Sequence, residues 1–345
     1  MTDELPAVRS GHPYIMYEMI KETPAGIRKT LEVMGREDYS FPGEVLYFTG
    51  NGTAYHSAVV GAQSLWESGK KWHAIQAYEI EKYYRTSGTV IGFSHTGKTK
   101  STVDTITKAK LDSYTVGVTH YANSPLAMVS DHRIIIGDSP DKSLCNTKAF
   151  FDNVFASLEI AKNFGDLGTD SFELLGLVER TIRDSEKPVK EIAENLNPVK
   201  DIFVLGSGPN YIAAREAAQK IKESTHLHAE GIELEEFNHG CTSVIDDQTL
   251  LVILDTPEVS QRTQDIVKAC RHVATKTLVL NGEGDFTIDF PVPENRYLYP
   301  VTAMVPLYYL AYFLALGLGV NPDYLRFEDQ RYLDYDSVVF PPGSH

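Results

Sequence analysis

The stretch VLYFTGNGTAYHSAVVGAQSLWE (45–67) has a second copy in this chain, IFVLGSGPNYIAAREAAQKIKE (202–223). A constant offset of 156 (206 − 50) aligns identical residues: Gly50 with Gly206, Gly52 with Gly208, Tyr55 with Tyr211, Ala58 with Ala214, Ala62 with Ala218 and Gln63 with Gln219. Each copy has the pattern of a buried strand, a glycine turn and a helix. The sequence therefore predicts two copies of one domain.

Around the first copy, short apolar runs alternate with stretches of helical periodicity. The expected strands are 45–50, 72–78, 89–94, 114–119 and 132–137. Strands that alternate with helices predict an α/β domain with a parallel sheet flanked by helices. Before the first strand, 12–34 predicts a helix with a break near Pro24.

The same patterns divide the chain into segments. We expect an N-terminal helical segment and a first domain, then a polar linker bounded by prolines, a second domain that includes a C-terminal tail, and a last short tail. Their ranges are 1–40, 41–184, 185–201, 202–336 and 337–345.

Composition excludes several classes of protein. With 345 residues and 42% hydrophobic residues, the chain can build sizeable cores. Its formal charge of −15 argues against nucleic acid and anionic membranes as partners. Three cysteines without a C-x-x-C pair indicate a reducing compartment. Residues 1–14 lack the pattern of a signal peptide, so we expect a cytoplasmic protein.

The uncharged run AMVPLYYLAYFLALGLGV (303–320) is long enough to raise the question of a membrane span. A buried helix in the core of an α/β protein has the same composition, and nothing else in the chain resembles this run. We favour the core helix.

GFSHTGKT (92–99) matches the nucleotide-binding pattern G-x-x-x-x-G-K-[ST], and TLLVILD (249–255) resembles its acidic partner strand. However, 90–94 and 251–255 occupy equivalent positions in the two copies, whereas a nucleotide site needs neighbouring strands of one sheet. Gly92 also lies inside the strand pattern. The motif therefore predicts no nucleotide site.

The loop SHTGKTKST (94–102) still has the chemistry of an anion site. It follows a strand and opens a helix, whose N-terminal N–H groups favour a phosphate. Hydroxyl donors are dense here: Ser94, Thr96, Thr99, Ser101 and Thr102. The alternative is an ordinary helix cap, for which one such residue suffices.

Five segments in order now resemble the sugar isomerase (SIS) domain family. They are HPYIMYEMIKETPAGIRKTLE (12–32), GNGTAYHS (50–57), FSHTGKTKST (93–102), NTKAF (146–150) and KIKESTHLHAEGIELEEFNHG (220–240). The most similar branches are the isomerase half of glucosamine-fructose-6-phosphate aminotransferase and the amino-sugar-phosphate deaminases and deglycases. The resemblance implies two tandem SIS-type αβα sandwiches.

The resemblance also implies the site. The residues expected to bind a phosphorylated sugar or amino sugar are Gly52, Thr53, Ser94, His95, Thr96, Thr99 and Asn146. The family implies a homodimer with shared active sites, no cofactor and no metal. A metal site at His226 and His228 is also disfavoured by their i,i+2 spacing, which makes them face apart on a helix.

Isomerisation needs a base that moves a proton between carbons 1 and 2, and a group that opens the sugar ring. By resemblance, Glu223 is the base, Lys220 its electrostatic partner, and His239 the ring-opening histidine that acts in the neighbouring subunit. The alternatives are an exposed helix salt bridge for Glu223 and Lys220, and a turn histidine for His239.

The chain also departs from the family pattern. Ala54 replaces a loop serine, Lys98 a glutamate, and Cys241 a proline, and no lysine follows Lys276 in the tail. We further expect no glutaminase domain, because the first cysteine is Cys145. The expected activity is that of a phosphosugar isomerase/deaminase on a glucosamine-6-phosphate-like substrate. The alternatives are an aminotransferase-type isomerase subunit, a deglycase, and a non-catalytic sugar-phosphate-binding regulator.

Overall fold

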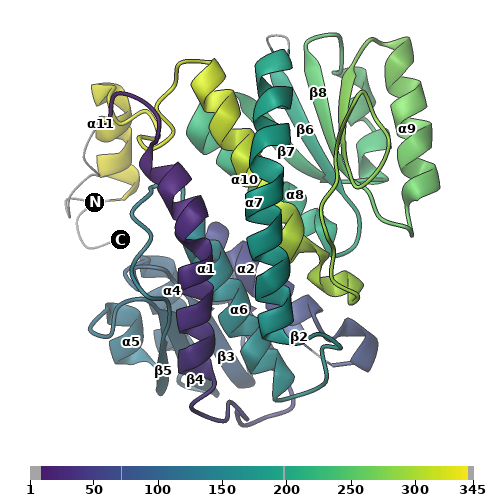
Figure 1. Ribbon diagram of the computed structural model, residues 1–345. Helices are drawn as coiled ribbons and strands as arrows, with labels where there is room; N and C mark the ends of the chain where they lie inside the picture. Colours follow the sequence, from purple (N-terminus) through teal and green to yellow (C-terminus); the bar gives the residue numbers. More distant parts are fainter. Residues whose placement is uncertain (1–8, 71, 197–198, 341–345) are drawn as a thin grey trace. The chain divides into compact units, whose positions relative to one another are not determined.

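A computed structural model of the chain describes residues 9–70, 72–196 and 199–340 (Figure 1). The chain divides into two compact units. The first contains Lys21–Leu175 together with 326–340, and the second contains Arg9–Ile20 and Gly176–Leu325. Each unit has its own five-stranded sheet, and each is described below by itself.

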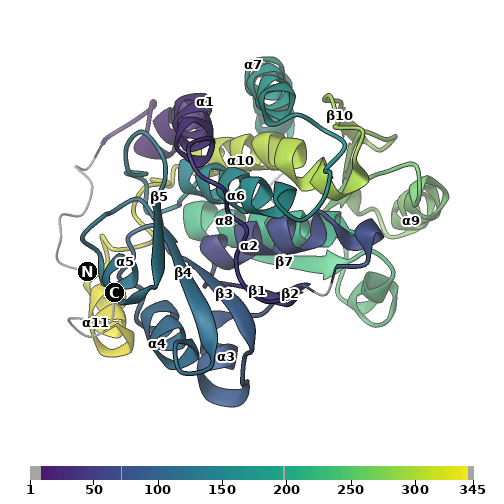
Figure 2. The ribbon, with the colours of Figure 1, turned by 90° about the horizontal axis from the view of Figure 1, so that it is seen from below.

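The first sheet has the strand order β2-β1-β3-β4-β5, and all four neighbouring pairs are parallel (Figure 2). Its strands are β1 (Leu46–Thr49), β2 (Trp72–Ala74), β3 (Gly88–Phe93), β4 (Ser113–Thr119) and β5 (His132–Ile135). Because a parallel sheet is covered on both faces, its central strands are largely buried: Val90, Ile91 and Phe93 of β3 are fully buried.

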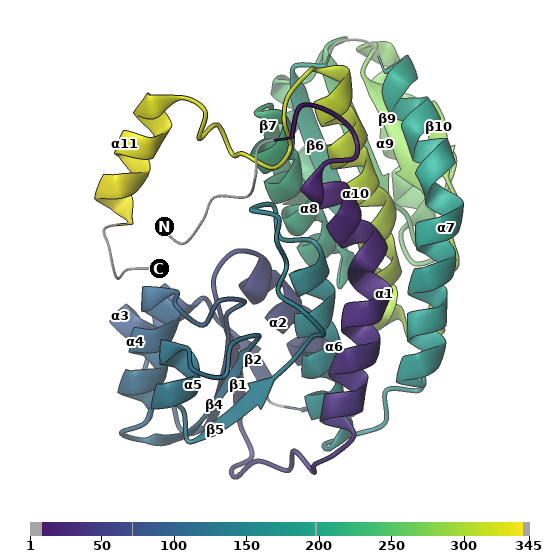
Figure 3. The ribbon, with the colours of Figure 1, turned by 60° about the vertical axis from the view of Figure 1, so that its left-hand side comes forward.

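Helices cover both faces of this sheet (Figure 3). One face carries α2 (Thr53–Gln63) and α6 (Lys148–Lys162), which pack against each other. The other carries α3 (Ala77–Tyr83), α4 (Lys100–Ala109) and α5 (Pro125–Val129). The helices α2 and α4 each begin just after a strand ends, so their N-termini lie at the edge of the sheet formed by the carboxyl ends of β1 and β3.

The second sheet has the order β10-β9-β8-β6-β7, which is the order of the first sheet written in reverse. Its strands are β6 (Asp201–Gly206), β7 (His228–Glu233), β8 (Thr249–Leu254), β9 (Lys276–Leu280) and β10 (Phe286–Ile288). Helix α8 (Asn210–Thr225) packs against α10 (Tyr299–Gly317), and α9 (Ser260–His272) packs Ile266 and Val267 against a different apolar cluster. The predicted fold, two tandem α/β sandwiches with parallel sheets, is confirmed.

The strand arrangement also bears on the nucleotide-binding motif. Gly92 pairs with Thr49 and Gly117 inside β3, and the acidic residue Asp255 follows β8, a strand of the other sheet. The two halves of the motif are thus not neighbours in one sheet, as the repeat indicated.

Three local expectations differ from the structure. Helix α1 (Ile15–Met34) runs through Pro24 without a break. A proline removes one helical hydrogen bond, but Met16, Met19 and Ile27 are fully buried and hold the helix on both sides of it. The predicted strand 72–78 ends at Ala74, because α3 already begins at Ala77.

The third difference concerns the expected linker, 185–201. Its first part forms the end of α7 (Ser171–Asn195), a helix that contains Pro188, while residues 197–198 lie outside the described residues. The last helix, α11 (Gln330–Val339), falls in the part of the tail that groups with the first unit, and residues 341–345 lie outside the description.

The long apolar run lies in α10. One helix among the described residues is long and apolar enough to cross a membrane, Arg296–Gly317, and 89% of its apolar window is buried inside the protein. Tyr308, Tyr309 and Tyr312 are fully buried in it. Burial on this scale is what the central helix of a folded domain requires.

Candidate active site

The hydroxyl-rich loop joins β3 to α4 in the first unit. Ser94 is buried, and its Oγ lies 3.1 Å from Thr99 Oγ1 and accepts the N–H of Gly97 at 3.1 Å. Gly97 has φ +65°, and a Cβ there would lie 2.1 Å from Ser124 Oγ, so the turn requires glycine. The loop is therefore compact and held by its own side chains.

The outer residues of this loop have the groups that an anion needs. Thr96 is exposed, and Thr99 stands at the N-cap of α4 without capping the helix through its side chain. The first N–H groups of a helix lack partners within the helix, and they favour a negative charge. The ordinary-cap alternative does not fit Thr99, because its hydroxyl turns to Ser94 instead.

The loop after β1 lies beside this one. Asn51 donates through Nδ2 to Ser101 Oγ at 2.9 Å and to Thr102 Oγ1 at 3.0 Å on α4. Gly52, with φ +52°, precedes Thr53, the first residue of α2. Two helix N-termini, those of α2 and α4, thus meet at the carboxyl edge of β1 and β3, where ligands of parallel α/β sheets usually bind.

A third loop reaches the same edge before α6 and contains Asn146, which is half-buried. The carboxylate of Asp141 organises this loop, because it accepts the N–H groups of Ser143 (2.9 Å), Thr147 (2.8 Å) and Ala149 (3.1 Å). His95 of the hydroxyl-rich loop is bonded to it, since its Nε2 lies 3.0 Å from the Asp141 nitrogen. Hydrogen bonds therefore connect the loops that hold the seven predicted substrate-binding residues.

A buried polar cluster supports these loops from inside the unit. His120 Nε2 lies 2.9 Å from Asp152 Oδ2 on α6, and both side chains are enclosed. Burial raises the pKa of Asp152 well above its ordinary value and lowers the pKa of His120 to about 4. Burial therefore disfavours the charged form of each member of the pair. Nearby, Lys148 Nζ contacts Asp138 Oδ1 at 2.5 Å and Ser139 Oγ at 2.8 Å.

The predicted base lies in the second unit, on the last turns of α8. Glu223 Oε2 accepts from Lys220 Nζ at 2.7 Å, and its Oε1 accepts from Gln219 Nε2 at 2.7 Å. The side chain of Glu223 is 22% exposed, whereas that of Lys220 is 1% exposed. An exposed surface salt bridge does not describe this pair, because the lysine is enclosed. The carboxylate is oriented and reaches solvent.

Sequence reasoning missed the residues behind this pair. Glu216 is fully buried, 3.7 Å from Lys220 Nζ, and it accepts from the hydroxyl of Tyr308 on α10 at 3.1 Å. The spacing of 216, 220 and 223 places the three charged groups on one face of the helix, a signal that was available in the sequence. Gln219 lies four residues before Glu223 and had the same signal, whereas Tyr308 on α10 had none.

His239 has a different environment from Glu223. It follows the 3₁₀ turn η2 (Glu236–Asn238), which buried Phe237 anchors, and precedes η3 (Cys241–Ser243). Its side chain is 68% exposed, and Nε2 lies 3.9 Å from Glu235 Oε1. Within the described ranges no bond joins His239 to Glu223. The imidazole of His239 therefore lies at the surface of its own unit.

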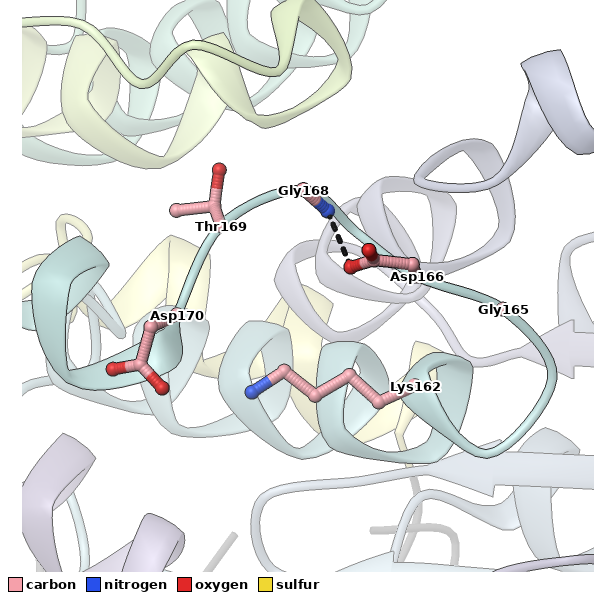
Figure 4. A pocket seen from close by; sticks show the side chains of 6 residues that line it. All are labelled: Lys162, Gly165, Asp166, Gly168, Thr169 and Asp170. Carbon is pink, nitrogen blue, oxygen red and sulfur yellow. Dashed lines mark hydrogen bonds between the residues drawn. The ribbon is translucent and has the colours of Figure 1, made fainter.

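A cluster of metal-binding side chains or a surface hollow would be a further place for a ligand to bind. In the part of the chain that the structure describes, no group of three or more His, Cys, Asp or Glu residues is arranged to hold a metal. One open hollow lies on the loop between α6 and α7, lined by Lys162, Gly165, Asp166, Gly168, Thr169 and Asp170 (Figure 4). Asp166 accepts the N–H of Gly168 there at 2.8 Å, so the hollow is a loop turn that contains none of the predicted site residues.

The chain has relatives among known proteins. The chain is 28% identical over 344 residues to the isomerizing glutamine–fructose-6-phosphate aminotransferase of Pyrococcus horikoshii, a match that covers 92% of this chain and 57% of that protein. This chain therefore corresponds to little more than half of that relative.

Two solved structures share the fold at 20% sequence identity. The C-terminal domain of glucosamine-fructose-6-phosphate aminotransferase from Francisella tularensis has a TM-score of 0.80, with 92% of this chain and 100% of that chain covered. Glucosamine-6-phosphate deaminase from Thermotoga maritima has a TM-score of 0.78, with 91% and 98% covered.

The family assignment follows from a family model that matches both halves of the chain. The SIS domain model matches residues 44–162 and 195–312. The first range contains β1 to β5 and the second contains β6 to β10. The chain belongs to the SIS domain family and carries two SIS domains in tandem.

Proposed function

We propose that this chain is a phosphosugar isomerase/deaminase that converts an amino-sugar phosphate such as glucosamine 6-phosphate, with water, into fructose 6-phosphate and ammonia. The observation that carries the proposal is Glu223, a carboxylate whose two oxygens are bonded to Gln219 and Lys220 while the side chain keeps access to solvent. A base that moves a proton between two carbons needs this combination of fixed orientation and access.

In this proposal the two domains have separate tasks. The first domain holds the distal phosphate through Ser94, Thr96 and Thr99 and the N-terminus of α4, with Gly52, Thr53, His95 and Asn146 around the sugar. In the second domain Glu223 takes the proton from C2 of the open-chain amino aldehyde and returns it to C1, which leaves an imine at C2 that water hydrolyses to the ketone and ammonia. The ammonium group of Lys220 orients the carboxylate and stabilises the negative charge that develops on the substrate.

His239 completes the proposed site from the partner subunit of a homodimer. Ring opening needs a proton taken from one oxygen and given to another, and an imidazole does both near neutral pH. The exposed position of His239, without a bond to Glu223 in its own described chain, supports a role in a neighbouring copy.

A second candidate is the isomerase part of a glutamine–fructose-6-phosphate aminotransferase, which runs the same proton transfer in the direction of synthesis. The similarity to the Pyrococcus horikoshii aminotransferase favours it. The name of the Thermotoga maritima neighbour favours the deaminase.

The test is incubation of the purified chain with glucosamine 6-phosphate, measuring ammonia and fructose 6-phosphate together. We expect equal amounts of both, and a loss of about 100-fold or more in rate for Glu223→Gln, which keeps the side-chain shape but removes the base. Glu230→Gln, on the exposed part of β7, is the matched control and should keep full activity.

Other results separate the alternatives. Glucosamine 6-phosphate formed only when a glutaminase is added would favour the aminotransferase, and release of fructose 6-phosphate only from its amino-acid adduct would favour a deglycase. Binding of sugar phosphates without turnover of any of them would leave a regulator and end the enzyme proposal.

A further inference from the structure

His95 is the second residue of the hydroxyl-rich loop, but its ring is hydrogen-bonded to the protein backbone. Nε2 lies 3.0 Å from the backbone nitrogen of Asp141. Since that nitrogen is a donor, Nε2 accepts, and the proton of the neutral ring resides on Nδ1. Burial lowers the pKa of His95 to about 3, so the ring stays neutral at physiological pH and offers no positive charge to a phosphate.

Asp141, the partner of His95 in this hydrogen bond, also holds a second loop together. Asp141 donates its backbone N–H to His95, while its carboxylate accepts the three N–H groups of Ser143, Thr147 and Ala149. Movement of Asp141 would therefore release the whole stretch before α6, including Asn146. The His95–Asp141 bond is the link between that stretch and the hydroxyl-rich loop.

His95 is itself held in place by the end of β4. Its carbonyl oxygen accepts the N–H of His120 at 3.2 Å and the hydroxyl of Thr119 at 3.1 Å. The His120 ring packs edge-on to the His95 ring with centroids 4.7 Å apart, and Asp152 fixes His120 from α6. Three successive strands, β3, β4 and β5, thus have their following loops joined through one histidine.

We propose that His95 is a positioning residue that locks the loop after β3 to the loop before α6, and that it sets the phosphate-binding geometry without touching the phosphate. This inference rests on the proposed function, since it assumes that the hydroxyl-rich loop binds the phosphate of a sugar. The contacts to the phosphate are then left to the hydroxyls of Ser94, Thr96 and Thr99 and to backbone N–H groups.

Two measurements on the full chain test the proposal. Hydrogen exchange reports on residues 139–149, and calorimetric titration with fructose 6-phosphate, the product in the proposed function, reports on phosphate binding. The variants are His95→Ala, which removes the acceptor, and His95→Gln, whose amide oxygen can accept the Asp141 N–H. His272→Ala, an exposed histidine at the end of α9, is the control.

We expect His95→Ala to speed exchange of 139–149 and to weaken fructose 6-phosphate binding, each by about tenfold, the effect of losing one buried hydrogen bond. His95→Gln should restore both to within about threefold of the parent chain. Weaker binding in His95→Ala with unchanged exchange would overturn the proposal and make His95 a direct ligand. Unchanged binding and exchange would overturn it as well.

Failure of the proposed function has a separate signature. If the parent chain bound no fructose 6-phosphate, the hydroxyl-rich loop would not be a sugar-phosphate site, and the exchange comparison would still decide whether His95 holds Asp141.

Discussion

The carboxylate of Glu223 illustrates how much of a site the sequence can predict. Its identity and its pairing with Lys220 follow from a motif and from i,i+3 spacing on one helix, and the structure has that contact at 2.7 Å. The bond from Tyr308 to Glu216 joins residues 92 positions apart, and the His95–Asp141 bond joins residues 46 apart. Contacts of this kind depend on how elements pack, and local pattern does not encode them.

Asp152 gives the sharpest test of electrostatics at the scale of one residue. Its raised pKa means that the folded chain keeps a proton that the unfolded chain loses above the ordinary value of 3.8. The free energy of unfolding of the parent chain should therefore fall, relative to Asp152→Asn, as the pH rises above 3.8, by about 1.4 kcal/mol per pH unit until the raised pKa is reached. Asparagine can replace the protonated acid, donating to His120 and accepting from Thr30.

Urea unfolding of both proteins, carried out between pH 4 and pH 8 in steps of about one pH unit, measures this difference in the free energy of unfolding. The exposed Asp112→Asn is the control and should show no such trend. If the parent chain instead gained stability over Asp152→Asn as the pH rose, the pKa of Asp152 would be lowered in the folded chain and not raised.

Among the elements, the presence of the strands was the most predictable feature, and the ends of the helices and strands were the least predictable. Apolar runs located β1, β3 and β4 because central strands of a parallel sheet are buried on both faces, and a further run located the edge strand β5. The break expected at Pro24 does not occur, since tertiary burial of α1 outweighs one missing hydrogen bond. The pairing of α2 with α6 was not predictable, because it depends on tertiary packing, which includes a close approach at one glycine.

That glycine is Gly61, in the middle of α2. A Cβ on Gly61 would lie 2.4 Å from both Cβ and Oγ of Ser157 on α6. Although alanine favours a helix, Gly61→Ala should therefore destabilise the chain by about 1 to 3 kcal/mol through overpacking. Adding Ser157→Gly removes the clash, so the double variant should be more stable than the sum of the single changes by about 1 kcal/mol or more.

Urea unfolding of the four proteins of this cycle gives the coupling. Gly176→Ala on α7 is the control, because its Cβ would meet nothing within 4 Å, and it should be neutral or slightly stabilising. Additive effects of Gly61→Ala and Ser157→Gly would show that α2 and α6 do not meet at this point.

At the scale of the whole molecule, the chain consists of two copies of one domain. The two sheets have the same strand order, with β1, β3 and β4 of the first corresponding to β6, β8 and β9 of the second. The copies have since diverged: Ser94 after β3 corresponds to Asp255 after β8, a carboxylate that would repel a phosphate. In the proposed function, the phosphate loop therefore belongs to the first copy and the charged face of α8 to the second.

The proposed homodimer makes a prediction about mixed subunits. If His239 acts in the partner's site, Glu223→Gln and His239→Ala homodimers are each inactive, but a hybrid of the two contains one site with both groups intact. Random one-to-one assembly should then recover about a quarter of the parent activity, since half of the dimers are hybrids with one working site in two. Co-expression with two different tags and an ammonia assay measures this recovery. No recovery would place Glu223 and His239 in the same subunit's site, or His239 outside it.

The most direct test of the central claim, that Glu223 carries a proton between C2 and C1, is to run the glucosamine 6-phosphate reaction in D₂O and locate deuterium in the fructose 6-phosphate by NMR. The account predicts deuterium at C1, because a carboxylate that has taken the C2 hydrogen exchanges it with solvent before returning it. The same deuterium should be lost together with turnover in Glu223→Gln and retained in Glu230→Gln. Deuterium incorporation that persists at the parent rate in Glu223→Gln would contradict the account.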